Sequence, residues 1–179
     1  MNTVRCFLIS VSFAFVSCAD DPRVLIDEGN RDLNTGRLER AHSRFASALE
    51  GLPEGESRMR DEARLGLCEA LATLDPSRCK TEFLALARER STSTAAYSSV
   101  VSTLVDERHF EEAIAILEFG LTQRPDDPKL RGLVDQVGGL HDAFLANAGQ
   151  TDEQAAEAKA RLRGLGYTGE ALPRQRSPR

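Results

Sequence analysis

The residues in this sequence best suited to chemistry are three histidines and one pair of adjacent carboxylates. His42, His109 and His141 lie far apart, and none can be matched to a serine, cysteine or carboxylate as a catalytic partner. Glu111-Glu112 suits a helix N-terminus, where carboxylates interact favourably with the helix dipole. The sequence contains no His-Glu-x-x-His, Gly-x-Ser-x-Gly, phosphate-loop or dinucleotide motif. We therefore expect surface histidines and no catalytic residue.

Two cysteines in the middle of the chain do not have the pattern of a metal or redox site. Cys68 and Cys79 are not a Cys-x-x-Cys pair, and no histidine lies close in sequence to either of them. We expect no metal ion, no cofactor and no small-molecule substrate.

The composition indicates one α-helical domain. The chain has 179 residues, of which 41% are apolar and 6% aromatic, with no tryptophan. No stretch alternates apolar and polar residues, with β-branched residues among them, for long enough to predict a sheet. Residues 1–17 contain one basic and no acidic residue, so 22 basic and 28 acidic residues remain. A chain with this balance is a poor candidate for nucleic-acid binding, which needs a concentrated basic surface.

The N-terminal segment resembles a bacterial lipoprotein signal peptide. Arg5 precedes an uncharged, mostly apolar run over residues 6–17, whose length as a helix, about 18 Å, is too short for a bilayer core of roughly 30 Å. Phe15-Val16-Ser17-Cys18 resembles a lipobox. The resemblance implies a signal peptide over residues 1–17 and a lipid on Cys18. Ala19 after the cysteine implies the outer membrane, facing the periplasm. Cleavage after Ala19 is the alternative, and it would release a soluble periplasmic or secreted protein.

Two segments share one spacing of small, bulky apolar and proline residues. They are Ala41, Phe45, Ala48 and Pro53, and then Ala113, Leu117, Gly120 and Pro125. Residues three or four apart share one helix face, and proline ends a helix. The pattern resembles the second helix of the tetratricopeptide repeat, a helix-turn-helix unit of about 34 residues. The resemblance implies an all-α fold in which antiparallel helical hairpins stack as a short right-handed solenoid with C-terminal capping helices.

The resemblance places the repeats within residues 18–149. Hairpins are expected at about 22–55, 59–93 and 94–127, followed by a capping helix at 128–148, and the register of the middle hairpin is not fixed by the pattern. Glu28 and Asp32 depart from the family pattern, and Arg108 replaces its turn glycine. A C-terminal helix is expected within 150–170. Residues 171–179 contain three arginines and are expected to form a disordered basic tail.

The resemblance also bears on the two cysteines. In this repeat, the positions of Cys68 and Cys79 face one another on the two helices of the middle hairpin. Because the signal peptide indicates export to an oxidising compartment, the resemblance implies a disulfide between them. Two buried, reduced thiols that pack as small apolar side chains are the alternative.

The family binds partner proteins along the groove formed by its first helices. In this sequence that groove contains Arg23, Ile26, Asn30, Leu33 and Asn34 of the first hairpin, and Ser98, Ser102 and Asp106 of the third. Only Asn30 matches the residues with which chaperone-binding members hold a terminal carboxylate, so that ligand is not expected. We expect a non-catalytic adaptor that binds another envelope protein or peptide segment and supports assembly of an envelope complex. A self-associating structural protein and a soluble accessory protein are the alternatives.

Overall fold

A computed structural model describes residues 21–53, 55–90, 92–148 and 153–169 of the chain. Within these ranges it consists of eight α-helices and no strand, which confirms the expected all-α class. The helices are α1 (Pro22–Asn34), α2 (Leu38–Gly51), α3 (Ser57–Leu74), α4 (Pro76–Glu89), α5 (Thr94–Asp106), α6 (Phe110–Gln123), α7 (Pro128–Ala148) and α8 (Glu153–Gly164). The expected signal peptide, the lipid site at Cys18 and the expected tail at 171–179 lie outside the described residues.

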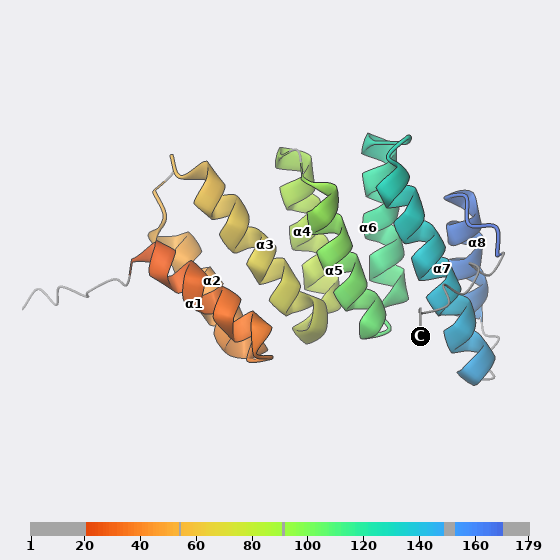
Figure 1. Cartoon of the computed structure of the whole chain (residues 1–179), viewed down its shortest axis with the longest axis horizontal. Helices are drawn as coiled ribbons and strands as arrows, with labels where there is room; N and C mark the ends of the chain where they lie inside the picture. Colours follow the sequence, from red (N-terminus) through yellow and green to blue (C-terminus); the bar gives the residue numbers. More distant parts are fainter. Residues whose placement is uncertain (1–20, 54, 91, 149–152, 170–179) are drawn as a thin grey trace, which may run out of the picture.

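The helices form antiparallel hairpins that lie side by side in a row (Figure 1). Helices α1, α3, α5 and α7 form one side of the row and contact one another in that order. Helices α2, α4, α6 and α8 form the other side, where α4 contacts α6 and α6 contacts α8. A continuous apolar core lies between the two layers. No helix in the described ranges is both long enough and apolar enough to span a membrane.

Three of the helices begin at an Asp-Pro pair. These pairs are Asp21-Pro22 at α1, Asp75-Pro76 at α4 and Asp127-Pro128 at α7. Each aspartate accepts hydrogen bonds from backbone N–H groups of the first turn, at 2.9 to 3.2 Å. Proline at the first helical position has no N–H to satisfy, and its fixed φ suits a helix. The chain therefore starts these helices through local interactions.

The first two hairpins meet where the ring of Phe45 lies against glycine backbone. Phe45, on α2, is fully buried. Its ring lies so close to Gly29 of α1 that a Cβ added there would be 2.8 Å from it. A Cβ added at Gly66 of α3 would be 2.3 Å from the same ring. One aromatic side chain therefore sets the approach of both α1 and α3, and both approaches require glycine.

The same kind of contact recurs toward the C-terminal end. A Cβ at Gly120 of α6 would lie 2.7 Å from the ring of Tyr97 of α5, and one at Gly138 of α7 would lie 2.6 Å from the ring of Tyr167. The Tyr167 hydroxyl also donates a hydrogen bond of 2.9 Å to Asp142 Oδ2 of α7. These contacts hold the segment after α8 on α7.

A buried carboxylate joins the two helices of the first hairpin. Asp32, on α1, is fully buried. Its side chain pairs with Arg44 of α2, with Arg37 Nε at 2.7 Å and with Arg40 Nε at 3.8 Å. Arg44 also pairs with Glu28 of α1 at 3.0 Å. Glu28 and Asp32, the two departures from the repeat pattern, thus have partners on α2 that compensate the burial of charge.

The structure corrects the expectation that His141 is a surface residue. His141, on α7, is only 4% exposed, and its Nδ1 has no hydrogen-bond partner within the described part of the chain. The Phe110 ring meets it edge-on, with ring centroids 5.1 Å apart. Burial lowers the pKa of His141, Lys159 lowers it further, and Asp142 opposes both effects. The neutral imidazole is therefore the form that the fold prefers.

The glycine contacts of Phe45 predict a difference between two Gly→Ala substitutions. Gly66→Ala places a methyl group against a ring that cannot withdraw from the core, so we expect a loss of about 1–3 kcal/mol in the free energy of unfolding. A methyl group added at Gly132 of α7 has no atom within 4 Å. For Gly132→Ala we therefore expect the free energy of unfolding to rise by about 0.5–1 kcal/mol, because the unfolded chain loses backbone freedom. Urea denaturation of both variants measures these changes, and a stabilised Gly66→Ala protein would contradict the packing described.

Burial of His141 predicts a loss of stability at mildly acidic pH. Because its folded pKa lies below the unfolded value of about 6.5, protons bind the unfolded state more readily, and stability falls as pH drops from about 7.5 to 5.5. We expect His141→Leu to remove most of this fall and His42→Gln, on the surface of α2, to retain it. Thermal melts over this pH range test the expectation, which is wrong if His141→Leu retains the full fall.

Candidate functional site

The residues expected to bind a partner lie along α1 and α5. Arg23, Asn34 and Asp106 are exposed, while Asn30, Leu33, Ser98 and Ser102 are partly exposed. We call the outer surface of α1, α3, α5 and α7 the odd-helix face.

Ile26 is the one residue expected to bind a partner that is not on this surface, because it is 3% exposed and belongs to the core. Its assignment to a partner-binding surface was wrong, since its side chain belongs to the apolar core between the helices.

The structure brings residues of α3 onto this face that the sequence pattern did not identify. Asn30 of α1 donates a 3.5 Å hydrogen bond to Glu62 of α3, and Ser99 of α5 donates one to Glu69 of α3. Glu62 and Glu69 are seven residues apart, so they lie two helical turns apart on one side of α3. Glu62, Glu69 and Asp106 therefore give the middle of the odd-helix face an acidic character.

A cleft between α5 and α7 continues the odd-helix face. It is lined by both apolar and polar side chains, and we call it the α5–α7 cleft. A small gap of about 10 Å³, whose lining includes Ser102, Val105, Asp106, Gln136 and Leu140, lies beside a cavity of about 500 Å³. That cavity is lined by Val105, Asp106, Arg108, Phe110, Leu140, Ala143, Phe144 and Asn147. Because the gap and the cavity share three residues, they form one depression.

Arg108 closes one side of this cavity through an unusual backbone conformation. It stands where the repeat pattern has a turn glycine, and it has a φ of 68°, in the left-handed region. Its guanidinium lies 5.1 Å from the centroid of the Phe144 ring, a cation–π contact. Asp106, two residues earlier, is exposed and has no hydrogen bond or ion pair within the described ranges. The cleft therefore contains the Arg108 guanidinium over an aromatic ring, the Asp106 carboxylate and several apolar side chains.

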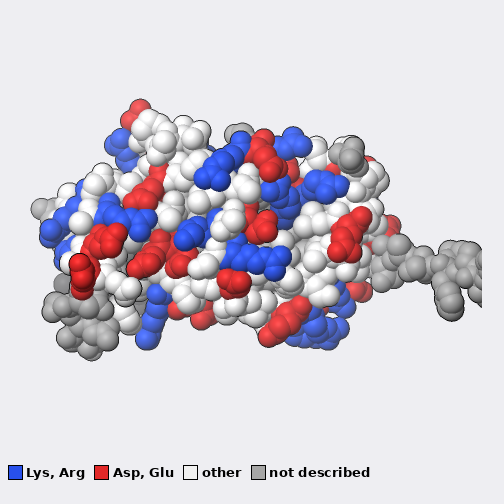
Figure 2. All heavy atoms as spheres, turned by 180° about the vertical axis from the view of Figure 1, so that it is seen from behind, with Lys and Arg blue, Asp and Glu red and all other residues white. Residues whose placement is uncertain are grey.

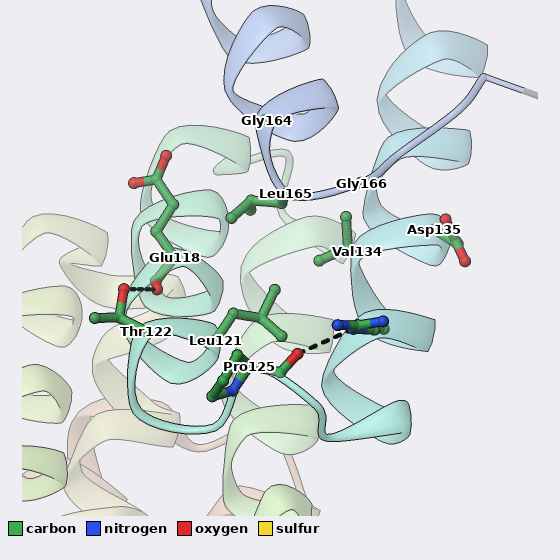
Figure 3. Close-up of a pocket in the computed structure, with 10 residues that line it drawn as sticks. Glu118, Leu121, Thr122, Pro125, Val134, Asp135, Gly164, Leu165 and Gly166 are labelled. Carbon is green, nitrogen blue, oxygen red and sulfur yellow. Dashed lines mark hydrogen bonds between the residues drawn. The ribbon is translucent and has the colours of Figure 1, made fainter.

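A second depression, of about 550 Å³, lies between α6, α7 and the end of α8 (Figure 3). Two of its charged side chains, Glu118 and Arg131, already have partners. Both Glu118 oxygens accept hydrogen bonds from Arg161, at 2.8 and 2.6 Å. Arg131 donates to the Pro125 carbonyl at 3.0 Å and to Asp126 at 3.2 Å. These contacts attach α8 to α6 and fix the α6–α7 turn, so the depression follows from how the C-terminal helix packs.

The opposite surface, formed by α2, α4, α6 and α8, has a different charge pattern. Figure 2 shows basic and acidic side chains interspersed over it. Arg78 lies 4.0 Å from Glu82 within α4, and Arg161 lies 2.6 Å from Glu118 across α8 and α6. We call this surface the even-helix face. These two pairs contrast with Asp106 at the α5–α7 cleft, which has no ion pair within the described ranges.

The described residues contain no cluster of three histidine, cysteine or acidic side chains that could hold a metal ion. His42 and His109 are partly exposed, on α2 and just before α6, and His141 is buried in α7. Glu111 and Glu112 lie in the first turn of α6, the position expected from the sequence.

The two cysteines do not form the expected disulfide in the structure. Cys68 of α3 and Cys79 of α4 are free thiols, 1% and 0% exposed. Burial raises the pKa of Cys68 to about 12, and burial together with the neighbouring Cys68 raises the pKa of Cys79 above its usual range. The structure thus has the alternative arrangement, in which both thiols pack as small apolar groups.

No protein-family model matches the sequence, and no curated protein and no solved structure matches the chain. The geometry described above is therefore the basis for the proposals that follow.

The burial of both thiols predicts how they react. In the folded protein we expect Cys68 and Cys79 to resist iodoacetamide at about pH 8, because they are inaccessible and protonated. After unfolding without reductant, both should react. Peptide mass spectrometry after each treatment measures this. Rapid labelling of the folded protein would contradict the burial, and thiols that stay unreactive after unfolding would indicate the disulfide.

Proposed function

We propose that this chain is a non-catalytic protein-interaction adaptor of the bacterial cell envelope, and that it binds its partner along the odd-helix face. The main observation behind this proposal is that four helices form this face together. It ends in the α5–α7 cleft, whose exposed groups have few partners within the described chain. On the even-helix face, Arg78 and Arg161 are paired with neighbouring acids. A tetratricopeptide-like architecture, suggested by the spacing of small, bulky and proline residues, supports the same role.

We further propose that a lipid on Cys18 anchors the adaptor to a membrane, with the outer membrane as its location. Three residues separate Cys18 from Pro22, the first residue of α1. At about 3.3–3.6 Å per residue, this connection keeps the first residue of α1 within roughly 15 Å of the anchor. Helix α1 would then begin close to the bilayer. A soluble protein released by cleavage after Ala19 is the alternative location.

A self-associating protein is a second candidate, supported by an exposed apolar side chain at the N-terminal end of the row. Val24 of α1 is 49% exposed. Helix α1 belongs to the first described hairpin, so a second copy could pack against its outer side. Loss of self-association in Val24→Arg, measured by sedimentation, would support this candidate over the adaptor.

Crosslinked affinity purification from the detergent-solubilised envelope of the native host tests the adaptor. We expect the wild-type protein to retain one stoichiometric partner, and Asn30→Arg with Ser102→Arg on the odd-helix face to reduce its recovery by about tenfold or more. Both positions are partly exposed, so these substitutions leave the core unchanged. Growth with labelled fatty acid, followed by mass spectrometry of Cys18, tests the anchor.

Ser43→Arg with Ser47→Arg is the matched control, because both serines are exposed on α2 of the even-helix face. It adds the same charge to the opposite surface and should retain the partner. If the protein recovers only itself, unchanged by either double variant, the adaptor proposal is wrong.

A further inference from the structure

We infer that His141 makes the C-terminal end of the row sensitive to pH. Its protonation detaches α8 from α6 and α7 at mildly acidic pH, while the first three hairpins stay folded. The imidazole is 4% exposed, and its Nδ1 has no hydrogen-bond partner in the described part of the chain. Because His141 is not on the odd-helix face that we propose for partner binding, this response goes beyond the proposed function.

Helix α8 covers His141. A cavity of about 370 Å³ lies between the start of α6, the second half of α7 and the first half of α8. Its lining includes His141 of α7, Phe110 of α6, and Gln154, Ala155 and Ala158 of α8. Because α8 forms one wall of this cavity, its detachment would bring water to the imidazole. The open state would then take up a proton more readily than the closed state.

The charged groups around His141 also favour proton uptake in the open state. Burial lowers the pKa of His141, Asp142 on the same helix raises it, and Lys159 of α8 lowers it. Detachment of α8 ends the burial and removes Lys159 while Asp142 stays, so each change stabilises the imidazolium. Other titratable groups line the cavity from α6 and the turn before it, and they stay beside the imidazole in both states. They are Arg108, His109, Glu111 and Glu112.

Helix α8, the last helix of its layer (Figure 1), lacks the bulky apolar residue that the other helices of this layer bury. In α2, α4 and α6 this residue is fully buried, as Phe45, Phe83 and Leu117. In α8 the same spacing, four residues after Ala155, gives Lys159, whose side chain is 35% exposed. Local opening occurs preferentially where few apolar groups are buried, so α8 is the helix expected to open first.

The ion pairs of α8 do not compensate for this missing residue. Lys159 Nζ lies 2.8 Å from Asp142 of α7, and Arg161 lies 2.6 Å from Glu118 of α6. The four side chains are between 27% and 36% exposed. Because ion pairs in contact with water contribute little to stability, the free-energy difference between a buried and a hydrated imidazolium can shift the equilibrium toward the open state.

Hydrogen–deuterium exchange of the full chain, measured by peptide mass spectrometry, tests the inference. Labelling times at about pH 7.5 and 5.5 are scaled so that the intrinsic exchange is equal. If only the open state binds the proton, with the usual histidine pKa of about 6.5, its equilibrium constant rises about tenfold between these pH values. We expect peptides of α8 to lose protection by up to about this factor, and peptides of α1 to α4 to change less than about twofold.

Variants assign the response to one histidine. His141→Leu should remove the loss of protection in α8, because leucine takes up no proton. His141→Gln is also uncharged over this pH range and replaces it if His141→Leu does not fold. His109→Gln is the matched control, because His109 lines the same cavity but is partly exposed. It should respond as the wild type does. Circular dichroism melts at about pH 7.5 establish that each variant is folded.

Several results would overturn the inference. These are a loss of protection in α8 of less than about twofold in the wild-type protein, or a full response that the His141 variants retain. An equal loss in all hairpins would also overturn it, because His141 would then act on the stability of the whole chain and not on α8. A response that His109→Gln abolishes would assign the proton to the other histidine.

Discussion

The stacking of the hairpins depends on aromatic rings that lie directly on glycine backbone. Phe45 touches both Gly29 and Gly66, and Tyr97 touches Gly120 in the third hairpin. Because protein cores are packed to nearly crystalline density, a ring at such a site sets the separation of the helices around it. On the odd-helix face, α1 contacts α3 through the pair Asn30–Glu62, and α3 contacts α5 through the pair Ser99–Glu69.

The helices and their buried faces could be predicted because they depend on short-range information. Asp-Pro pairs start α1, α4 and α7 through hydrogen bonds that span two or three residues. The small and bulky residues that repeat at intervals of three or four are fully buried at Ala41, Phe45 and Ala48, and again at Ala113 and Leu117. A helix face needs only its own period to be recognised. The left-handed φ at Arg108 also falls where the pattern expects glycine.

The features that were missed depend on groups that are distant along the chain. Asp32 is buried because three arginines of the next helix and turn surround it, and no pattern within α1 reveals this. His141 is buried because Phe110, in another hairpin, packs against it. Ile26 was assigned to the odd-helix face, but it lies at the edge of that face and is buried in the core, whereas Arg23 and Asn34 of the same helix are exposed. Glu62 and Glu69 required the register of α3, which the repeat spacing alone does not fix.

The contacts of the first hairpin also determine how the molecule responds to mechanical load. A pulling force applied at residue 21 would act first on α1. That helix is joined to α2 by the ion pairs of Asp32 and Glu28, and its Gly29 lies on a Phe45 ring that also touches α3. Peeling α1 away would require the rupture of buried ion pairs and the exposure of an aromatic ring in the same step. The first three helices would therefore resist tension as one unit rather than detach one after another.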